Sequence, residues 1–319
     1  MIRALVHTKG RPIREELSLS KIAEAAASKS NTLWIDVDAP TKEELDALAS
    51  KFSISELTIS DILKNQCRPK VEQFDNYSLI VLRAFAPGSL DKSIQFSALL
   101  FSNALMTISA DPVTSQDELY EYVRKNPGPM ALGMDFVLYE VLARIIDSYS
   151  PYIKEITESL DELENETFER PDESIPVRLF DAKKQLYAFR KEAAPLQEIT
   201  DSISSLGIRF VSRCNAQYFQ DASGSLASLL DAVDSSMDLA NSLMEASLLE
   251  ETGNTNRSLR RIAAIALILL PPILLAAIFG MKFQGVPFSD LEMGFYLALM
   301  LILSLLVSSY YYFKRIDWI

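Results

Sequence analysis

The chain has 319 residues, of which 31 are basic and 43 are acidic, so its formal net charge is −12. This acidic balance excludes the basic surface that nucleic-acid binding requires, and we expect no nucleic-acid partner. Two cysteines without a C-x-x-C or C-x-x-H spacing suit a reducing cytoplasm, and a single histidine, His7, excludes a histidine-based zinc site within one chain.

The first 110 residues alternate short apolar runs with helical patterns, which is typical of a sheet that carries helices. His7 lies in the first expected strand, and residues 33–37 form another. Thr41, followed closely by two glutamates, predicts a helix start because acidic side chains are favourable in a first turn. Three further apolar runs, with Pro87-Gly88 between the first two, predict a hairpin or meander: residues 77–85, 95–101 and 104–109.

The sequence lacks the motifs that would indicate an enzyme. Neither G-x-G-x-x-G nor G-x-x-x-x-G-K-[ST] occurs, so nothing points to a nucleotide site. One histidine cannot supply a Ser/His/Asp or Cys/His set, because it lies in the first expected strand. We therefore expect a protein that is not an enzyme.

The pattern turns helical from about Met130 and stays so. Residues 134–168 form one long amphipathic stretch that ends at Pro171, and residues 176–206 form a second, ended by Gly207. Together they predict an antiparallel pair of helices. Acidic residues gather in the far half of the first, and we interpret them as a solvated face.

From Ala216 the helical pattern continues almost unbroken to Phe279, which is 64 residues or roughly 96 Å of helix. A helix of this length needs partners along its length. Four acidic residues at spacings of 3, 4 and 7 share one face of it: Asp231, Asp234, Asp238 and Glu245. Two interpretations stay open, a solvated stripe or, in a bundle of identical helices, a negative funnel that concentrates cations.

Two apolar runs without a charged residue close the chain, at residues 262–279 and 294–313. Eighteen helical residues span roughly 27 Å, close to the hydrocarbon thickness of a bilayer. The turn between them is short, so they predict a transmembrane hairpin. Arginines precede the first run and Lys314-Arg315 follow the second, which places both outer ends in the cytoplasm. A pair of buried core helices is the alternative, and the basic clusters at both ends disfavour it.

The N-terminal half carries the block Asp61-Ile62-Leu63 followed by Arg68-Pro69-Lys70-Val71-Glu72. Together with the motifs that follow it along the chain, this block resembles the CorA family of divalent-metal channels. Phe168-Glu169-Arg170-Pro171 resembles the break between the family's two "willow" helices. Other matching positions are spread over the second willow helix, the pore helix and the tail: Lys184, Leu186, Arg190, Pro195, Leu196, Asn256, Pro271, Gly280-Met281, Lys314-Arg315 and Trp318.

The resemblance implies an α+β fold in a funnel-shaped homopentamer. The expected parts are an α/β domain (1–130), the willow pair (131–207), a stalk helix (208–261), and a hairpin with a basic tail (262–319, with spans at about 262–280 and 294–313). It further implies gating by Mg2+ bound between subunits, with Asp61, Glu245 and Asp221 matching the regulatory carboxylates. The implied pore-lining residues are Asn256, Leu259, Ile262, Ala266, Leu270 and Ile273.

The outer-mouth signature departs from the family pattern. The family has Gly-Met-Asn, and this chain has Gly280-Met281-Lys282. Lysine has three donors, no acceptor and a positive charge, so a ring of lysines would oppose cation entry. Three explanations stay open: the side chain turns away from the axis, Asp290 or Glu292 neutralises it, or transport is altered or lost. Ile273 is a second departure, since the family often has threonine there.

Three functions are therefore weighed. The first is a CorA-type Mg2+ channel in the inner (cytoplasmic) membrane, with Co2+ or Ni2+ as surrogates. The second is a zinc transporter of the ZntB-like branch, in which Gly-Ile-Asn is typical, so Met281 favours magnesium. The third is a pentamer that senses divalent ions but does not conduct them or passes anions, which Lys282 favours and the acidic stripe opposes.

Overall fold

The computed structural model describes residues 2–28, 30–64, 67–85, 93–111, 114–169, 172, 174–205, 207–281, 293–316 and 318. The chain forms two compact units, Met1–Leu243 and Met244–Ile319. The first unit holds a seven-stranded sheet and nine helices or parts of helices within the described residues. The strands are β1 (Ile2–Thr8), β2 (Arg14–Glu16), β3 (Asn31–Asp38), β4 (Lys70–Gln73), β5 (Ser78–Phe85), β6 (Ser93–Leu100) and β7 (Ala104–Ser109).

The sheet has the order β2-β1-β3-β7-β6-β5-β4. Only the central pair of strands, β3 and β7, is parallel among the described pairings, and the others are antiparallel. The predicted meander is confirmed, because β5 pairs with β6 and β6 with β7. The strand predicted at residues 33–37 and the one that contains His7 are confirmed as β3 and β1.

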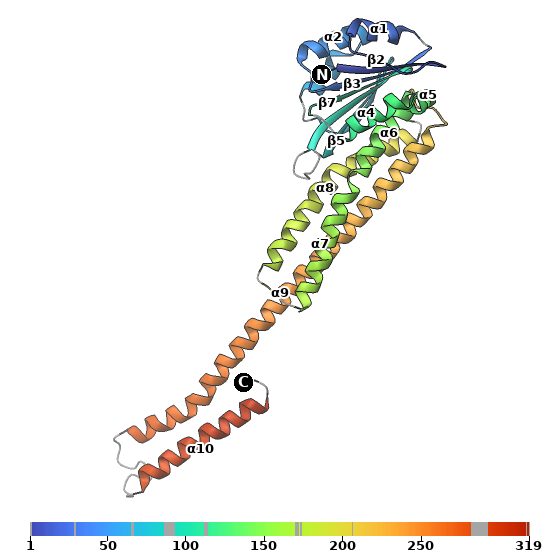
Figure 1. Cartoon of the computed structure of the whole chain (residues 1–319). Coiled ribbons are helices and arrows are strands. Elements are labelled where there is room, and N and C mark those ends of the chain that lie inside the picture. Colours follow the sequence, from blue (N-terminus) through green and yellow to red (C-terminus); the bar gives the residue numbers. More distant parts are fainter. Residues whose placement is uncertain are drawn as a thin grey trace. The chain divides into compact units, whose positions relative to one another are not determined.

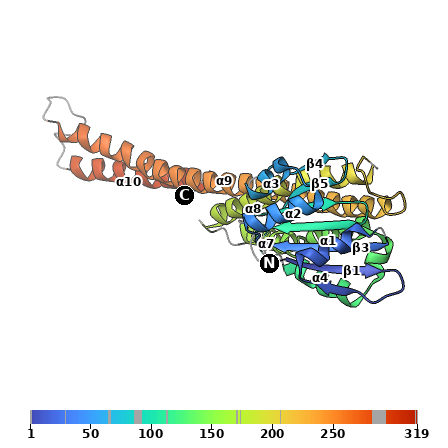
Figure 2. The same ribbon diagram turned by 90° about the horizontal axis from the view of Figure 1, so that it is seen from above.

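Helices cover both faces of the sheet, which gives three layers (Figure 1; Figure 2). On one face lie α1 (Leu19–Ala27), α2 (Lys42–Phe52) and α3 (Glu56–Leu63). Alternate strand residues point to them, so Leu33 and Ile35 join the core with α2 and α3, while Trp34 and Asp36 point to the other face. On that other face lie α4 (Thr114–Lys125), α5 (Gly128–Leu132) and α6 (Met134–Asp147).

The helix start predicted at Thr41 is confirmed as a capping box. The Glu44 backbone N–H donates to Thr41 Oγ1 at 3.3 Å, and the Thr41 N–H donates to Glu44 Oε2 at 3.0 Å. Both are N–H groups that a helix leaves without an intrahelical partner. Local sequence alone therefore determines where α2 begins.

The predicted helical pair needs two corrections. Helices begin earlier than Met130, with α4 at Thr114. The stretch at 134–168 is also not continuous, because α6 ends at Asp147 and α7 covers Ser150–Glu169. Pro151 has no N–H to continue the ladder, and Tyr149 turns into the core, where its ring lies 5.5 Å from Phe85 and 5.4 Å from Phe189.

The second member of the pair is confirmed as α8 (Ile175–Ser204), which contacts α7. Residues 170 and 171, where the break was predicted, lie outside the described residues, as do Pro87 and Gly88. The acidic far half of α7 is exposed to solvent, as expected, with Glu166 paired to Arg178.

The long helix is confirmed without a break as α9 (Ala216–Gly280, 65 residues). Neither its glycines nor Pro271-Pro272 interrupts it. In the second unit the last part of α9 runs alongside α10 (Gly294–Arg315), and both views show the two helices side by side (Figures 1 and 2). Both helices are long and apolar enough to cross a membrane.

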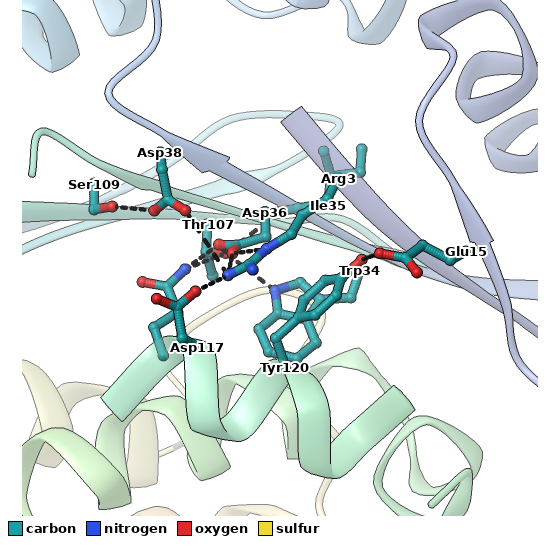
Figure 3. A network of polar contacts seen from close by, with 11 residues as sticks. Arg3, Glu15, Trp34, Ile35, Asp36, Asp38, Thr107, Ser109, Asp117 and Tyr120 are labelled. Carbon is teal, nitrogen blue, oxygen red and sulfur yellow. Dashed lines mark hydrogen bonds and ion pairs between the residues drawn. The ribbon is translucent and has the colours of Figure 1, made fainter. Parts of the chain in front are cut away.

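A buried carboxylate ties β1, β3, β7 and α4 together (Figure 3). Asp36 has a fully buried side chain, and one of its oxygens accepts from Arg3 Nε at 2.9 Å and Nη2 at 2.7 Å. The other accepts from the Thr107 hydroxyl at 2.7 Å and from the Gln116 amide of α4. Arg3 also pairs with Asp117 of α4. Four donors thus hold a charge that burial alone would exclude.

Burial raises the pKa of Asp36 to about 6, Asp38 adds to the rise, and the hydrogen bonds from Thr107 and Arg3 oppose it. The native state therefore binds this proton more tightly than the unfolded state does. The stabilisation is complete below about pH 4 and is lost as the pH rises through about 6, by about 3 kcal/mol. Thermal unfolding of the full chain in detergent, compared with Asp36→Asn across this range, measures it.

The free energy of unfolding of the wild type should fall relative to that of Asp36→Asn between those pH values. A difference that does not depend on pH is also expected, because the side-chain amide of the variant has two N–H donors where the wild type has only acceptors. Asp46→Asn, at an exposed carboxylate of α2, is the matched control. A constant difference between wild type and Asp36→Asn across this range would contradict the prediction.

Candidate functional site

The first candidate surface is one face of α9 within the second unit. The residues predicted to line a pore are exposed in the single chain: Asn256, Leu259, Ile262, Ala266, Leu270 and Ile273. At about 100° per residue, they share one side of the helix. Apart from Asn256 they are apolar, so this face has few oxygen atoms to offer to a cation.

The opposite side of the same helix is buried. Ala264 is 0% exposed and Ile268 is 7% exposed, and Pro272 one turn on is also buried. Because they are four residues apart, these three side chains lie on one side of the helix. At about 100° per residue, that side is about half a turn around the helix axis from the exposed face. Because α10 runs alongside this part of α9, we assign the buried side to packing against α10 (Figure 1). The exposed face is thus free for another partner.

Charged and aromatic residues mark one end of the hairpin. Arg257, Arg260 and Arg261 precede the apolar part of α9, and Lys314 and Arg315 end α10. The two helices are antiparallel, so these clusters lie at the same end. Tyrosines and a tryptophan accompany the cluster of α10: Tyr310, Tyr311, Tyr312 and Trp318. Basic and aromatic residues together are typical of a membrane–water interface.

The predicted mouth lies at the other end of the hairpin. Gly280 is the last residue of α9, and the exposed Met281 donates its backbone N–H to the Ile278 carbonyl at 3.2 Å. Lys282, Asp290 and Glu292 lie outside the described residues. The three explanations for Lys282 therefore remain hypotheses.

One member of the acidic stripe on α9 forms an ion pair. Asp231, Asp238 and Glu245 are exposed, as the pattern suggested. Asp234 instead pairs with Arg190 of α8, whose Nε donates to Asp234 Oδ1 at 2.6 Å. This ion pair raises the pKa of Arg190. One of the four carboxylates thus holds α8 against α9 and adds no free charge to the stripe.

The three carboxylates implied as metal ligands lie in different surroundings. Asp221 is exposed on α9, on a polar stretch of the helix surface that also carries Gln217, Gln220 and Ser225. Glu245 is exposed on the same helix, in the second unit. Among the described residues of one chain, no group of three His, Cys, Asp or Glu side chains could hold a metal ion.

Asp61 is the least free of the three. It lies on α3 with its side chain 12% exposed, and Lys70 Nζ donates to its Oδ2 at 2.7 Å. Lys64 Nζ lies 3.6 Å from the other oxygen. The hydrogen bond from Lys70 is the main cause that lowers the pKa of Asp61, which burial opposes. One oxygen of Asp61 thus accepts a hydrogen bond from Lys70, and the other has the exposed Lys64 ammonium at ion-pair distance.

A family model described as "CorA-like Mg2+ transporter protein" matches residues 29–315. The chain belongs to the CorA family. The match covers the sheet from β3 onward, the long helices and nearly all of the hairpin, so the matched region extends over both units. The resemblance seen in the short motifs is confirmed.

Relatives in the CorA family match over most of this chain. The "Cobalt/magnesium transport protein CorA" of Thermotoga maritima is 27% identical over 91% of this chain and 84% of its own length. The protein of the same name from Methanocaldococcus jannaschii is 23% identical over 94% of this chain and 95% of its own. The "Zinc transport protein ZntB" of Yersinia pestis is 21% identical over 93% and 90%.

Solved structures of the CorA fold agree with the architecture. "The complete structure of CorA magnesium transporter from Methanocaldococcus jannaschii" has a TM-score of 0.85 at 23% identity and covers 100% of this chain and 99% of that one. The full-length CmaX protein has a TM-score of 0.79 at 22% identity, over 99% and 97%. At these identities the likeness establishes the fold alone, and the expected α+β architecture with a long helix and hairpin is confirmed.

Sequence reasoning missed the two ion pairs that occupy predicted site residues. Arg190 and Asp234 are 44 positions apart, so no local pattern joins them. Lys70 was part of a motif in the N-terminal block, yet its position nine residues after Asp61 gives no sign of contact, because the two residues belong to different elements, α3 and β4. The one available signal was the group of basic residues that follows Asp61 in that block. Asp234 had no such signal, since no basic residue occurs between Arg213 and Arg257.

The Arg190–Asp234 pair predicts a recoverable charge reversal. Arg190→Asp should lower the melting temperature of the full chain in detergent by a few degrees, because two carboxylates then face each other across α8 and α9. Adding Asp234→Arg should recover part of the loss. Asp231→Arg alone, at an exposed position of α9, is the control. Failure of the double variant to recover would show that the pair does not hold the helices together.

Proposed function

We propose that this protein transports divalent cations across the membrane as a CorA-type channel, with Mg2+ the main substrate and Co2+ or Ni2+ as surrogates. The observation that carries the proposal is the match to two cobalt/magnesium transport proteins over 91% and 94% of the chain. The family model adds the hairpin, because it matches up to residue 315. Family membership supports transport in place of an enzymatic reaction. The apolar hairpin supports a membrane location, and the basic end supports a cytoplasmic side for both termini.

We infer a homopentamer in which five copies of α9 surround the pore and α10 lies outside. The exposed apolar face of α9 supports this, because one copy leaves it uncovered while α10 covers the opposite side. An apolar constriction suits a gate that closes when water leaves it. The remaining stripe carboxylates, Asp231 and Asp238, would attract cations toward the pore. The four-part division at residues 130, 207 and 261 stays part of this proposal.

In the proposed gating, Mg2+ bridges carboxylates of adjacent subunits and holds the ring closed. Asp61, Glu245 and Asp221 are the ligands that the family resemblance implies. Hard divalent ions accept oxygen ligands and keep several waters, so a few carboxylates across a gap suffice. Loss of the ion would leave carboxylates that repel one another, and the ring would loosen.

Zinc transport is the second candidate. A relative named "Zinc transport protein ZntB" matches 93% of the chain, which favours keeping it. Its identity of 21% is lower than the 27% of the cobalt/magnesium protein, and Met281 agrees with the magnesium branch. A non-conducting or anion-passing sensor remains the alternative that Lys282 suggests.

The first test is Mg2+ uptake into proteoliposomes that contain a magnesium-sensitive dye, for the wild type and Lys282→Asn. If the lysine ring opposes entry, Lys282→Asn should raise uptake by about tenfold or more, since even a single unit charge at short range is worth over 1 kcal/mol. Equal uptake would place the side chain outside the conduction path. Silence in both, with Zn2+ uptake or none, would reject the magnesium channel.

The proposed pore face has its own test by cysteine modification. In a background with Cys67 and Cys214 changed to serine, Ala266→Cys should react with a charged, membrane-impermeant thiol reagent and lose transport as a result. Ala264→Cys, two residues away on the buried side, is the matched control and should resist modification. The opposite order of reactivity would reverse the assignment of the two faces.

A further inference from the structure

Lys70 holds a position at Asp61 where a bound cation would lie. Its ammonium group lies 2.7 Å from Asp61 Oδ2 and 2.7 Å from Glu72 Oε1, so it bridges a carboxylate on α3 and one on β4. Its side chain is only 28% exposed. Although burial lowers it, the hydrogen bonds to both carboxylates raise the pKa of Lys70 above its ordinary value. The ammonium thus lies between two carboxylate oxygens, and both accept a hydrogen bond from it.

The backbone around Asp61 is fixed independently of the lysine. The Asp61 carbonyl accepts from the Cys67 thiol at 3.3 Å and from the Gln95 amide at 3.2 Å. Gln95 is 3% exposed, and its side-chain oxygen Oε1 accepts from the Cys67 backbone N–H at 2.9 Å. The backbone that carries this carboxylate is therefore held in place by hydrogen bonds, one of them from a residue of the buried strand β6. Removing the lysine should leave the carboxylate in place.

We propose that the Lys70 ammonium is an internal counter-ion of Asp61, which a divalent cation must displace before this carboxylate can serve as a ligand. Lys70 would then determine the concentration of divalent ion at which the regulatory site fills. The inference rests on the proposed function in one respect, that Asp61 binds divalent ions. It adds a competitor that belongs to the same chain.

Competition follows from the donor set. A carboxylate oxygen that accepts a charged hydrogen bond has lost part of its capacity to coordinate Mg2+, which requires near-octahedral oxygen ligands at short distance. Lysine can leave because its charge sits on a flexible four-carbon stem. After displacement it keeps Glu72 as partner, so the exchange does not leave a buried charge alone.

Lys64 supplies a matched control on the same carboxylate. Its Nζ lies 3.6 Å from Asp61 Oδ1, and its side chain is 64% exposed. Exposed pairs at such distances contribute little. Both lysines carry the same charge near the same carboxylate. A difference between the effects of their variants on Mg2+ binding therefore reports the direct hydrogen bond of Lys70 and not the nearby positive charge alone.

The experiment is a Mg2+ titration of thermal stability of the full-length protein in detergent, starting from EDTA. The variants are Lys70→Met, which keeps the stem and removes the charge, Lys70→Arg, Lys64→Met and Asp61→Asn. Lys70→Met should melt lower than wild type in EDTA, because its ion pair is gone. It should also need about three- to tenfold less Mg2+ to reach half of its stabilisation.

Lys70→Arg should resemble wild type, Lys64→Met should shift the midpoint by less than twofold, and Asp61→Asn should weaken the Mg2+ response. A Lys70 with a merely structural role would lower the melting temperature equally with and without Mg2+, leave the midpoint unchanged, and overturn the proposal. A midpoint that rises, or the absence of any Mg2+ response in the wild type, would overturn it as well.

Uptake into proteoliposomes separates this inference from the proposed function. Uptake of Mg2+ by a wild type whose Mg2+ midpoint does not depend on Lys70 rejects the inference and keeps the transport function. A midpoint that shifts as expected in a protein that takes up no Mg2+ keeps the counter-ion at Asp61 and rejects transport.

Discussion

The structure depends on how one helix of 65 residues is supported along its length. Isolated helices gain little from their own hydrogen bonds, so α9 needs packing partners on both of its parts. In the first unit its apolar residues are buried against the helical pair, and the Arg190–Asp234 ion pair and the Ser223–Asp201 hydrogen bond add polar contacts. In the second unit α10 covers one side and leaves the other exposed.

That uncovered side connects the fold to the proposed function. In a bilayer, helices lose no backbone hydrogen bonds, so an apolar face can border lipid or another helix at little cost. The face with Leu259, Ile262 and Ala266 is apolar and exposed in a single copy, which by itself does not distinguish contact with a pore from contact with lipid. The proposed ring of copies would supply the distinction, because it would enclose one face of each α9 and turn α10 outward.

Charged groups in the first unit are paired more closely than their positions in the chain suggest. Asp36 is held by four donors from β1, β7 and α4, and Asp61 is held by Lys70. The two cases differ in depth. Asp36 is sealed from solvent and joins structural elements, whereas the side chains of Asp61 and Lys70 are 12% and 28% exposed, which gives the hydrated cation of our proposal a route to the pair. Only the second is therefore a candidate for regulation.

The sequence by itself determined the elements whose cause is local or periodic: the helix start at Thr41, the meander, the long helical stretch from Ala216, the apolar hairpin and its basic ends. One prediction of this kind was wrong, the continuous helix over residues 134–168. The apolar period alone would continue that helix, but Pro151 interrupts it. Only the tertiary structure decided which carboxylates are free. Arg190 with Asp234 and Lys70 with Asp61 meet because separate elements fold together, and a charge pattern records the sign of each group but not its partner.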